Sequence, residues 1–290
     1  MVNGPDSIFV EREGKIKRWN RSFTSKEKLE DVIQQIVGKC NRVVNEASPI
    51  VDARLESGER VNAVIAPVAL NGPILTIRRF SKQPITMEKL LQLGSLTEEC
   101  VRFLSKMVQA RYSILVGGGT GSGKTTFLGA LSEYIPNEER IITIEDNAEL
   151  RIQGIDNLVR LEAKAANLEG GRDITIRDLI KTALRMRPDR IIVGEVRSKE
   201  AVDMLQALNT GHEGSLSTAH ANSTKDMLSR LETMVLMGMN LPMEAIRRQI
   251  ASGLDLLIHL GRMRDRSRKV LEITEVLGYE NGEIQLNPLF

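Results

Sequence analysis

The chain has 290 residues, of which 41% are hydrophobic and 3% aromatic, and its formal net charge is +2. This length suits two domains with substantial cores. The near-neutral charge and scarce aromatic residues argue against a protein that coats nucleic acid, so no nucleic-acid partner is expected. No apolar run reaches the roughly 20 residues that a membrane-spanning helix needs. Cys40 and Cys100 lie far apart in helical stretches, and we interpret both as buried apolar residues in a reducing cytosol.

Residues 1–80 are predicted to form a small α+β domain. Short apolar runs at 8–10 and 15–17 flank a glycine turn. Thr24-Ser25-Lys26-Glu27 fits a capping box and predicts the start of a helix whose apolar face is Leu29, Val32, Ile33, Ile36 and Val37. Three strands, at 51–55, 61–65 and 74–78, are predicted to follow it.

Residues 81–96 contain Pro84 and a short amphipathic turn, and we expect them to be a linker. Over residues 97–290 the pattern changes to long helices that alternate with strands. Helices are predicted at 97–110 and from Thr175 and Ser198, and strands at 114–116, 141–144, 191–193 and 215–217. This alternation predicts an α/β domain, with a parallel sheet covered by helices on both faces.

One stretch fits a phosphate-binding loop, G-x-x-x-x-G-K-[ST], between the first of these strands and a helix. It reads Gly118-Gly119-Thr120-Gly121-Ser122-Gly123-Lys124-Thr125 and is followed by Thr126. Glycines let successive backbone N–H groups turn toward one centre, the lysine reaches the β- and γ-phosphates, and the Thr125 hydroxyl is suited to bind Mg²⁺. The alternative, a glycine-rich turn that matches by chance, does not account for the flanking strand and helix. We therefore expect these nine residues to bind a nucleoside triphosphate.

Acidic residues follow two of the other predicted strands. Glu195 ends the apolar run 191–193, after a glycine where many phosphate-loop enzymes carry an aspartate, and 143–151 holds several acids that include Glu145. Clustered carboxylates are costly unless a cation compensates them. We expect Glu195 to hold Mg²⁺ through water or to orient the attacking water, and Glu145 to activate the water. The alternative for Glu195 is a solvated strand end, and the alternative for 143–151 is an acidic loop that caps the next element.

Two further groups of side chains are candidates for phosphate binding. His212 and His220 lie among hydroxyl residues within 210–222, which suits recognition of a terminal phosphate better than a metal site. Arg60, Arg78 and Arg79 lie in the N-terminal domain. Arginine donates in a planar fork to phosphate oxygens, so these side chains could clamp a nucleotide. Taken alone, these arginines are better explained by a solvated strand face.

Taken together, and in their order along the chain, several segments resemble those of the ATPases of type II and type IV secretion and pilus assembly. The resemblance is strongest to the CpaF-like ATPases of tight-adherence (Flp) pili. The resemblance covers nearly the whole chain. The matching segments are Gly58-Glu59-Arg60-Val61-Asn62, Thr76-Ile77-Arg78-Arg79-Phe80, the phosphate loop, 143–151, 184–190, Gly194-Glu195-Val196-Arg197 and the stretch that ends at His220.

The resemblance implies a RecA-like ATPase domain at 97–290 behind a smaller, PAS-like domain at 1–80. It implies that Glu145 and Glu195 are the catalytic acids and that His220 meets the γ-phosphate. It also implies that arginines matching Arg60 and Arg78 contact the nucleotide, which favours the clamp over the solvated strand face. The division of labour between the two acids stays open.

The resemblance further implies a homo-hexamer at the cytoplasmic face of the inner membrane, working with a polytopic platform protein and a pilin system. Members usually carry a further N-terminal helical region, so we expect this chain to be truncated. The Cys-x-x-Cys pair of some type II members has no match in the sequence. ATP and Mg²⁺ are therefore the expected cofactors, and no zinc is expected.

Two other functions remain to be weighed against an ATP-driven motor. A DNA-translocating or helicase-type motor would need a positive channel, which the near-neutral charge and few aromatic residues disfavour. A nucleotide switch without catalysis would not need Lys124, Glu145 and Glu195 together.

Overall fold

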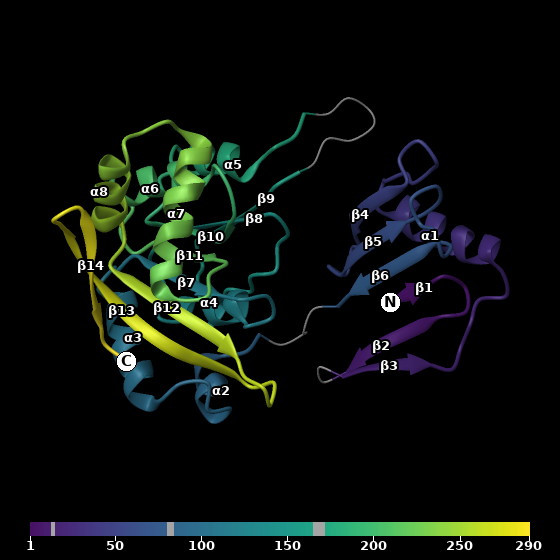
Figure 1. Cartoon of the computed structure of the whole chain (residues 1–290), viewed down its shortest axis with the longest axis horizontal. Helices are drawn as coiled ribbons and strands as arrows, with labels where there is room; N and C mark the ends of the chain where they lie inside the picture. Colours follow the sequence, from purple (N-terminus) through teal and green to yellow (C-terminus); the bar gives the residue numbers. More distant parts are fainter. Residues whose placement is uncertain (13–14, 80–83, 165–171) are drawn as a thin grey trace. The chain divides into compact units, whose positions relative to one another are not determined.

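A computed structural model describes residues 1–12, 15–79, 84–164 and 172–290. The chain divides into two compact units, Met1–Lys82 and Gln83–Phe290, which are coloured along the sequence in Figure 1. Both cysteines are free, and whereas Cys100 is buried as predicted, Cys40 is only partly buried at the end of a helix.

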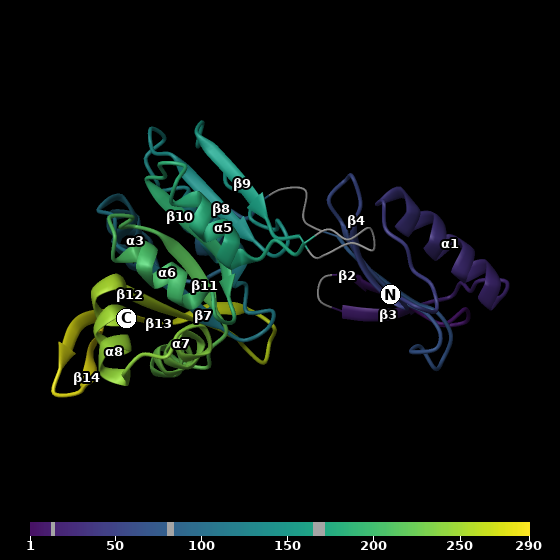
Figure 2. The ribbon, with the colours of Figure 1, turned by 90° about the horizontal axis from the view of Figure 1, so that it is seen from above.

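The first unit is an antiparallel sheet with one helix against it. The sheet has the order β3-β2-β1-β6-β5-β4, and helix α1 lies along one face of it (Figure 2). Buried residues of the helix meet alternate residues of β4–β6, which is the period expected of a sheet with one buried face. The elements are β1 (Val2–Asn3), β2 (Ile8–Arg12), β3 (Lys15–Trp19), α1 (Lys26–Lys39), β4 (Ile50–Arg54), β5 (Arg60–Val64) and β6 (Ile74–Arg78).

Helix α1 begins one residue later than the predicted capping box. Ser25, not Thr24, is the N-cap, and its hydroxyl accepts a hydrogen bond from the Lys28 backbone N–H at 3.2 Å. The hydroxyl of an N-cap satisfies one of the N–H groups left free in the first turn, and either residue type could supply it. The glycine turn predicted between β2 and β3 falls at residues 13–14, outside the described residues.

Most of the predicted linker instead packs into the second unit. Helix α2 (Met87–Gln92) has Thr86 as its N-cap, and Met87, Leu90 and Leu96 are buried in the same core as α3 and α4. The short amphipathic turn predicted within 81–96 is therefore a short helix with a buried face. This corrects the linker assignment for residues 85–96. Residues 81–83 lie outside the described part of the chain.

The second unit is built on an eight-stranded sheet of order β14-β13-β12-β7-β11-β10-β8-β9. The run from β12 to β9 is parallel, and β13 and β14 are added antiparallel at one edge. The strands are β7 (Ile114–Gly118), β8 (Ile141–Glu145), β9 (Leu158–Glu162), β10 (Arg190–Val196), β11 (Leu216–Ala219), β12 (Leu256–Arg262), β13 (Arg268–Glu280) and β14 (Glu283–Pro288).

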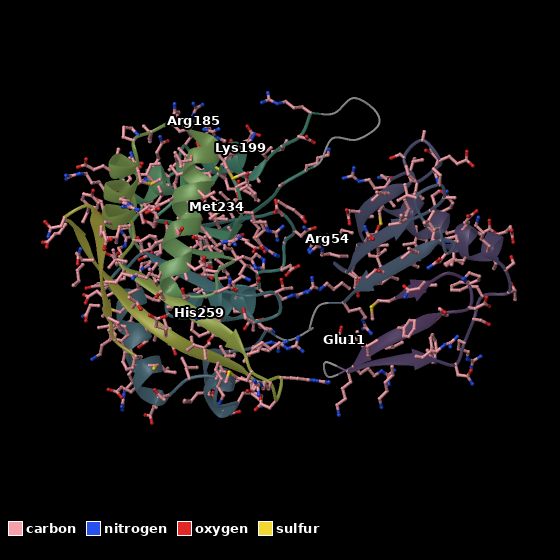
Figure 3. The ribbon with its side chains drawn as sticks, in the orientation of Figure 1. Glu11, Arg54, Arg185, Lys199, Met234 and His259 are labelled. Carbon is pink, nitrogen blue, oxygen red and sulfur yellow. The ribbon has the colours of Figure 1, made fainter. Side chains whose placement is uncertain are left out.

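Helices cover both faces of this sheet, as the alternating pattern predicts. One core joins α2, α3 and α4 to one set of strand side chains. The other joins α5 to α8 to the opposite set and includes Met234 of α7, labelled in Figure 3. The remaining helices are α3 (Glu98–Gln109), α4 (Lys124–Ser132), α5 (Ile176–Ala183), α6 (Ala201–Leu208), α7 (Thr224–Gly238) and α8 (Met243–Gly253).

Candidate functional site

The predicted phosphate loop connects β7 to α4 and leaves the start of α4 without a side-chain cap. Gly121 and Gly123 have φ values of 74° and 95°, which favour glycine, and Gly123 occupies the N-cap position. A Cβ on Gly118 would lie 2.5 Å from both the Leu260 carbonyl oxygen and the Ser122 hydroxyl. The backbone N–H groups at the start of α4 therefore have no side-chain acceptor from the N-cap, and such a helix start favours an anion.

Lys124 is folded back over this loop. Its Nζ donates hydrogen bonds to the carbonyl oxygens of Gly118 at 3.0 Å and Gly119 at 3.2 Å. The side chain is buried, and burial is the main cause that lowers the pKa of Lys124. A buried cation whose oxygen partners are backbone carbonyls gains when a phosphate replaces them as its partner. Thr125 and Thr126, both half-buried, follow it on the first turn of α4.

The sheet order brings the other predicted site residues to the edge where the phosphate loop lies. Strands β7, β11, β10 and β8 are consecutive neighbours, and His220, Glu195 and Glu145 lie at or next to the ends of the last three. Because parallel strands share one carboxyl edge, these groups meet there although they are far apart in sequence. His220 Nδ1 accepts a hydrogen bond from Lys124 Nζ at 3.4 Å.

This hydrogen bond also indicates the protonation of His220. An ammonium group only donates, so Nδ1 must be unprotonated and Nε2 carries the ring proton. Burial, followed by the charge of Lys124, lowers the pKa of His220, which agrees with a neutral ring. His220 Nε2 lies 2.8 Å from Glu195 Oε1, but the ring does not aim a hydrogen bond at that oxygen, which is buried without one.

Glu195 is held from its other side by an arginine that the sequence reasoning gave no role. Arg197 donates to Glu195 Oε2 through Nε at 2.8 Å and through a second guanidinium nitrogen. A third nitrogen of Arg197 lies 3.4 Å from Asp146 Oδ2. Arg197 thereby links the acid after β10 to the acidic segment after β8, and charge-assisted contacts of this kind fix a carboxylate well.

Glu145 occupies a buried position with one oxygen bonded and one free of hydrogen bonds. Oε2 accepts from the backbone N–H groups of Glu149 at 2.7 Å and Leu150 at 2.8 Å, whereas Oε1 is buried without a hydrogen bond. Burial is the main cause that raises the pKa of Glu145. A carboxylate with a raised pKa and an unoccupied oxygen is a better proton acceptor for water near neutral pH than an exposed one.

The glycine before Glu195 has a steric reason in this structure. A Cβ on Gly194 would lie 2.8 Å from Glu145 Cγ, so any larger residue would displace that side chain. The aspartate that many phosphate-loop enzymes carry at this point could not coexist with Glu145 in its present position. The carboxylates present at this edge are therefore Glu145 on β8 and Glu195, one residue after Gly194, on β10.

The expected Mg²⁺ fits the groups at this edge. Glu145 Oε1 and Glu195 Oε1 are two buried carboxylate oxygens without hydrogen bonds, and buried polar atoms of this kind call for a water or an ion. Among the described residues, no cluster of three or more His, Cys, Asp or Glu side chains is arranged to hold a metal ion by itself. A phosphate-bound Mg²⁺ needs no such cluster, because it keeps several waters and takes its other ligands from phosphates and one or two side chains.

The predicted arginines belong to the first unit, and His212 lies at the other edge of the second sheet. Arg60 and Arg78 are directly paired across β5 and β6, and Arg54 pairs with Arg60 across β4 and β5, so three arginines form one row on the first unit (Arg54 is labelled in Figure 3). Arg79 is exposed just after β6. His212 precedes β11 at the edge opposite to His220, with Nδ1 3.3 Å from the Ala207 carbonyl oxygen, so the two histidines do not form one site.

Two features of the site escaped sequence reasoning. Arg197 follows Glu195 by two residues in the sequence. The opposite charges of these two residues at a strand end were the signal that could have indicated their contact. The turn between β12 and β13 carries five basic residues within 262–269, and it lies against the phosphate loop, where Arg268 Nε donates to the Gly121 carbonyl oxygen at 2.9 Å. The basic run was visible in the sequence, but only the fold brings it to the loop.

The family model described as "Type II/IV secretion system protein" matches residues 1–282. The chain belongs to this family. It is similar to a putative conjugal transfer protein of Mycobacterium tuberculosis, with 37% identity over 98% of this chain and 82% of the relative. It is also similar to the type IV secretion system protein PtlH of Bordetella pertussis, with 33% identity over 94% of this chain and 88% of the relative.

Solved structures of secretion ATPases share the fold. The VirB11 ATPase of the Brucella suis type IV secretion system is 31% identical, with a TM-score of 0.55 over 94% of this chain and 90% of that chain. The pilus retraction motor PilT, at 21% identity, has a TM-score of 0.64 over 99% of this chain and 76% of that chain, a likeness of fold alone. This secretion-family protein is an ATPase.

Proposed function

We propose that this secretion-family ATPase is a hexameric motor that powers pilus assembly or protein secretion at the cytoplasmic face of a membrane. The observation that carries the proposal is a set of side-chain contacts at the carboxyl edge of the second sheet. There Lys124 contacts His220 at 3.4 Å, and His220 lies 2.8 Å from Glu195. A cation, a neutral imidazole and an acid in contact beside a phosphate loop suit hydrolysis of a bound triphosphate.

Each side chain has a role in this proposal. Backbone N–H groups of 118–125 and the Lys124 ammonium bind the β- and γ-phosphates, and Thr126 borders the α-phosphate. Glu145 accepts a proton from the attacking water through its free oxygen, and His220 donates to the γ-phosphate. Thr125, and Glu195 through water, would hold Mg²⁺, which supplies positive charge to the phosphate oxygens when bound.

We propose the CpaF-like, tight-adherence branch for this ATPase, with a pilin system and a polytopic membrane platform protein as its partners. The support is the order of motifs along nearly the whole chain. The names of the relatives include conjugal transfer, type IV secretion and pilus retraction, so the direction of work is left open. Among the described residues, no helix is both long and apolar enough to span a bilayer. We assign the membrane contact to the platform protein, and we describe the first unit as PAS-like.

Two variants of one site test this proposal. Lys124→Ala should lose both nucleotide binding and turnover, because it removes the cation that meets the phosphates. Glu195→Gln should keep ATP bound while turnover falls about 100-fold or more, because a catalytic acid or base contributes 10²–10⁴-fold and glutamine keeps its volume. Calorimetric ATP titration and phosphate release measure the two effects.

The trapped ATP state of Glu195→Gln also tests the assembly. Its mass by native mass spectrometry should correspond to six copies of the chain. A Glu195→Gln variant that loses ATP binding as fully as Lys124→Ala would make Glu195 a binding or folding residue. A particle of one or two copies with ATP bound would contradict the ring.

A further inference from the structure

The segment that carries His220 is short and is held between a strand and a helix. Strand β11 ends one residue before His220, and α7 begins at Thr224, so residues 220–223 join the two elements. Ala221 is buried, and its Cβ lies 3.4 Å from the position that a Cβ on Gly117 would take, just before the phosphate loop. The place of the imidazole in the site therefore depends on where α7 begins.

The first residue of α7 is bonded to a strand from another part of the chain. Thr224 is buried, and its hydroxyl donates a hydrogen bond to Glu272 Oε1 on β13 at 2.8 Å. The contact also brings the Glu272 carboxylate near the start of a 15-residue helix, where the helix dipole favours a negative charge. Glu272 thus supplies both an acceptor for Thr224 and a charge that suits the beginning of α7.

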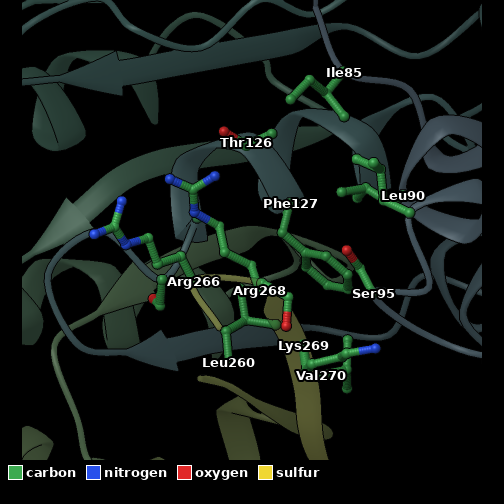
Figure 4. Close-up of a pocket in the computed structure, with 14 residues that line it drawn as sticks. Ile85, Leu90, Ser95, Thr126, Phe127, Leu260, Arg266, Arg268, Lys269 and Val270 are labelled. Carbon is green, nitrogen blue, oxygen red and sulfur yellow. The ribbon is translucent and has the colours of Figure 1, made fainter. Parts of the chain in front are cut away.

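Strand β13 is a fixed base for this contact, because its own beginning is bonded to the phosphate loop. Arg268 Nε donates to the Gly121 carbonyl oxygen at 2.9 Å, and the Val270 backbone N–H donates to the Ser95 carbonyl oxygen at 2.8 Å. Arg268 and Val270 line a cavity of about 250 Å³ beside the start of α4 (Figure 4). The phosphate loop and the start of α7 are therefore both bonded to one stretch of strand, residues 268–272.

Two other neighbours of Glu272 do not account for its contact with α7. His259 lies opposite Glu272 in the pairing of β12 with β13 and is labelled in Figure 3. Burial lowers the pKa of His259, so its ring is neutral at neutral pH and does not hold the carboxylate through charge. Thr274 donates to the same Oε1 at 2.8 Å, but this bond joins two residues of one strand. Of these contacts, the bond from Thr224 is the one that leads to the ATPase site.

We propose that Thr224 and Glu272 are positioning residues of this ATPase. Their hydrogen bond fixes the start of α7 and thereby holds His220 in contact with Lys124 and Glu195. The inference rests on the proposed role of His220 in turnover. The pair acts through the imidazole and not on the nucleotide itself. Loss of the bond lets the ring move while the phosphate loop keeps its shape, so hydrolysis falls more than nucleotide affinity.

Two matched threonine variants separate positioning from packing. Thr224→Val keeps the shape of the side chain but removes its hydrogen bond, and we expect kcat to fall about 10-fold, since a misplacement of about 1 Å can cost about 100-fold. ADP lacks the γ-phosphate and should bind within about 2-fold of wild type, because its phosphates stay with the loop. Thr274→Val is the control, since Thr274 is equally buried and donates to the same Glu272 oxygen; its kcat should match wild type.

A double-variant cycle shows whether the effect passes through His220. In a His220→Ala background, Thr224→Val should lower the remaining turnover by less than about 2-fold, because residues that act through one another are not additive. A loss in that background as large as in the wild type, or wild-type turnover of Thr224→Val alone, would overturn the positioning role. Wild-type turnover of His220→Ala would instead contradict the proposed function of His220, which is a distinct failure.

Glu272 provides a second test that does not depend on the threonine variants. Glu272→Gln keeps an oxygen acceptor for Thr224 and should retain kcat within about 3-fold, whereas Glu272→Leu removes the acceptor and should lose about as much as Thr224→Val. Phosphate release at saturating ATP measures kcat, and calorimetric ADP titration measures the affinity. Equal kcat in the glutamine and leucine variants would show that the hydrogen bond does not position the site and would overturn the pair.

Discussion

Glu145 combines a buried carboxyl group with a fixed orientation. Two backbone N–H groups hold Oε2, and Gly194 leaves the space that its side chain occupies. Burial raises its pKa above the ordinary 4.5, so the fold favours the protonated form and ionisation opposes folding. The contribution of Glu145 to stability is therefore most favourable below pH 4.5 and falls as the pH rises from that value through the raised pKa of the folded state.

Glu145→Gln should accordingly separate stability from activity. The amide oxygen can still accept from Glu149 and Leu150, but the side chain cannot ionise or accept a proton. We expect a higher melting temperature than wild type at pH 8, a smaller difference at pH 4, and turnover at least about 100-fold lower. Scanning calorimetry at the two pH values and a phosphate-release assay measure this. Glu99→Gln, at an exposed position on α3, is the control; equal turnover in both variants would remove Glu145 from the catalytic residues.

At the scale of elements, a buried ion pair joins the amino ends of the strands. Arg190, at the first position of β10, is fully buried. It donates to Glu139 through two nitrogens at 2.5 and 3.0 Å and to the carbonyl oxygen of Val108, on α3, at 2.6 Å. The guanidinium groups of Arg190 and Arg111 outweigh the burial of Glu139 and lower its pKa. The Arg190 side chain thus links β10 to α3 and to the loop that precedes β8. This contact lies at the amino edge of the sheet, opposite to the edge that carries Glu195.

Removing one partner of this pair should destabilise the unit without changing the nucleotide site. Glu139→Gln leaves the Arg190 charge buried and uncompensated, which costs about 3–5 kcal/mol for pairs of this kind. Urea unfolding monitored by circular dichroism should give this loss, while ATP affinity below the unfolding transition stays within 2-fold of wild type. Glu98→Gln, which removes an exposed pair with Arg102, should cost less than about 1 kcal/mol. A loss that small for Glu139→Gln would show that the pair is not needed for stability.

At the scale of the whole molecule, Arg54, Arg60 and Arg78 form one row across three strands of the first unit. These strands pair Arg54 with Arg60 and Arg60 with Arg78, and cross-strand partners lie on the same face of a sheet. Planar guanidinium groups suit phosphate oxygens. We propose that the first unit contributes to triphosphate binding through Arg60 and Arg78.

Arg60→Ala with Arg78→Ala tests this contribution. If both side chains contact the triphosphate, each contact is worth about 1.5–3 kcal/mol, and a closed state is favoured more by ATP than by ADP. The double variant should lose turnover and also the difference between ATP-analogue and ADP states in distances between spin labels on the two units. Lys15→Ala with Lys17→Ala removes the same charge from exposed positions of β3 and should retain both. Wild-type turnover and shape change in the arginine variant would contradict the clamp.

The sequence predicted the parts of the fold that carry strong local signals. Thr97 and Thr175 are the N-caps of α3 and α5, and the box at Thr175 is complete through Asp178. These motifs involve residues within one turn, so no tertiary contact is needed to find them. Strands β9 and β12 were not predicted, and each pairs with a strand outside its own segment, β9 with β8 and β12 with β7. The local hairpin of β13 and β14 was also not predicted.

By itself, the sequence determined the phosphate loop, the candidate acids and the family, because the loop is one continuous segment and the motifs have a fixed order. Only the tertiary structure decided which groups meet. The parallel order of β7, β11, β10 and β8 brings Lys124, His220 and Glu195 together, and the packing of β8 beside β10 explains Gly194. Likewise, α2 and the β12–β13 turn meet the start of α4 only in the folded chain. Side-chain contacts between separate strands depend on sheet order and register, which are long-range properties of the packed chain.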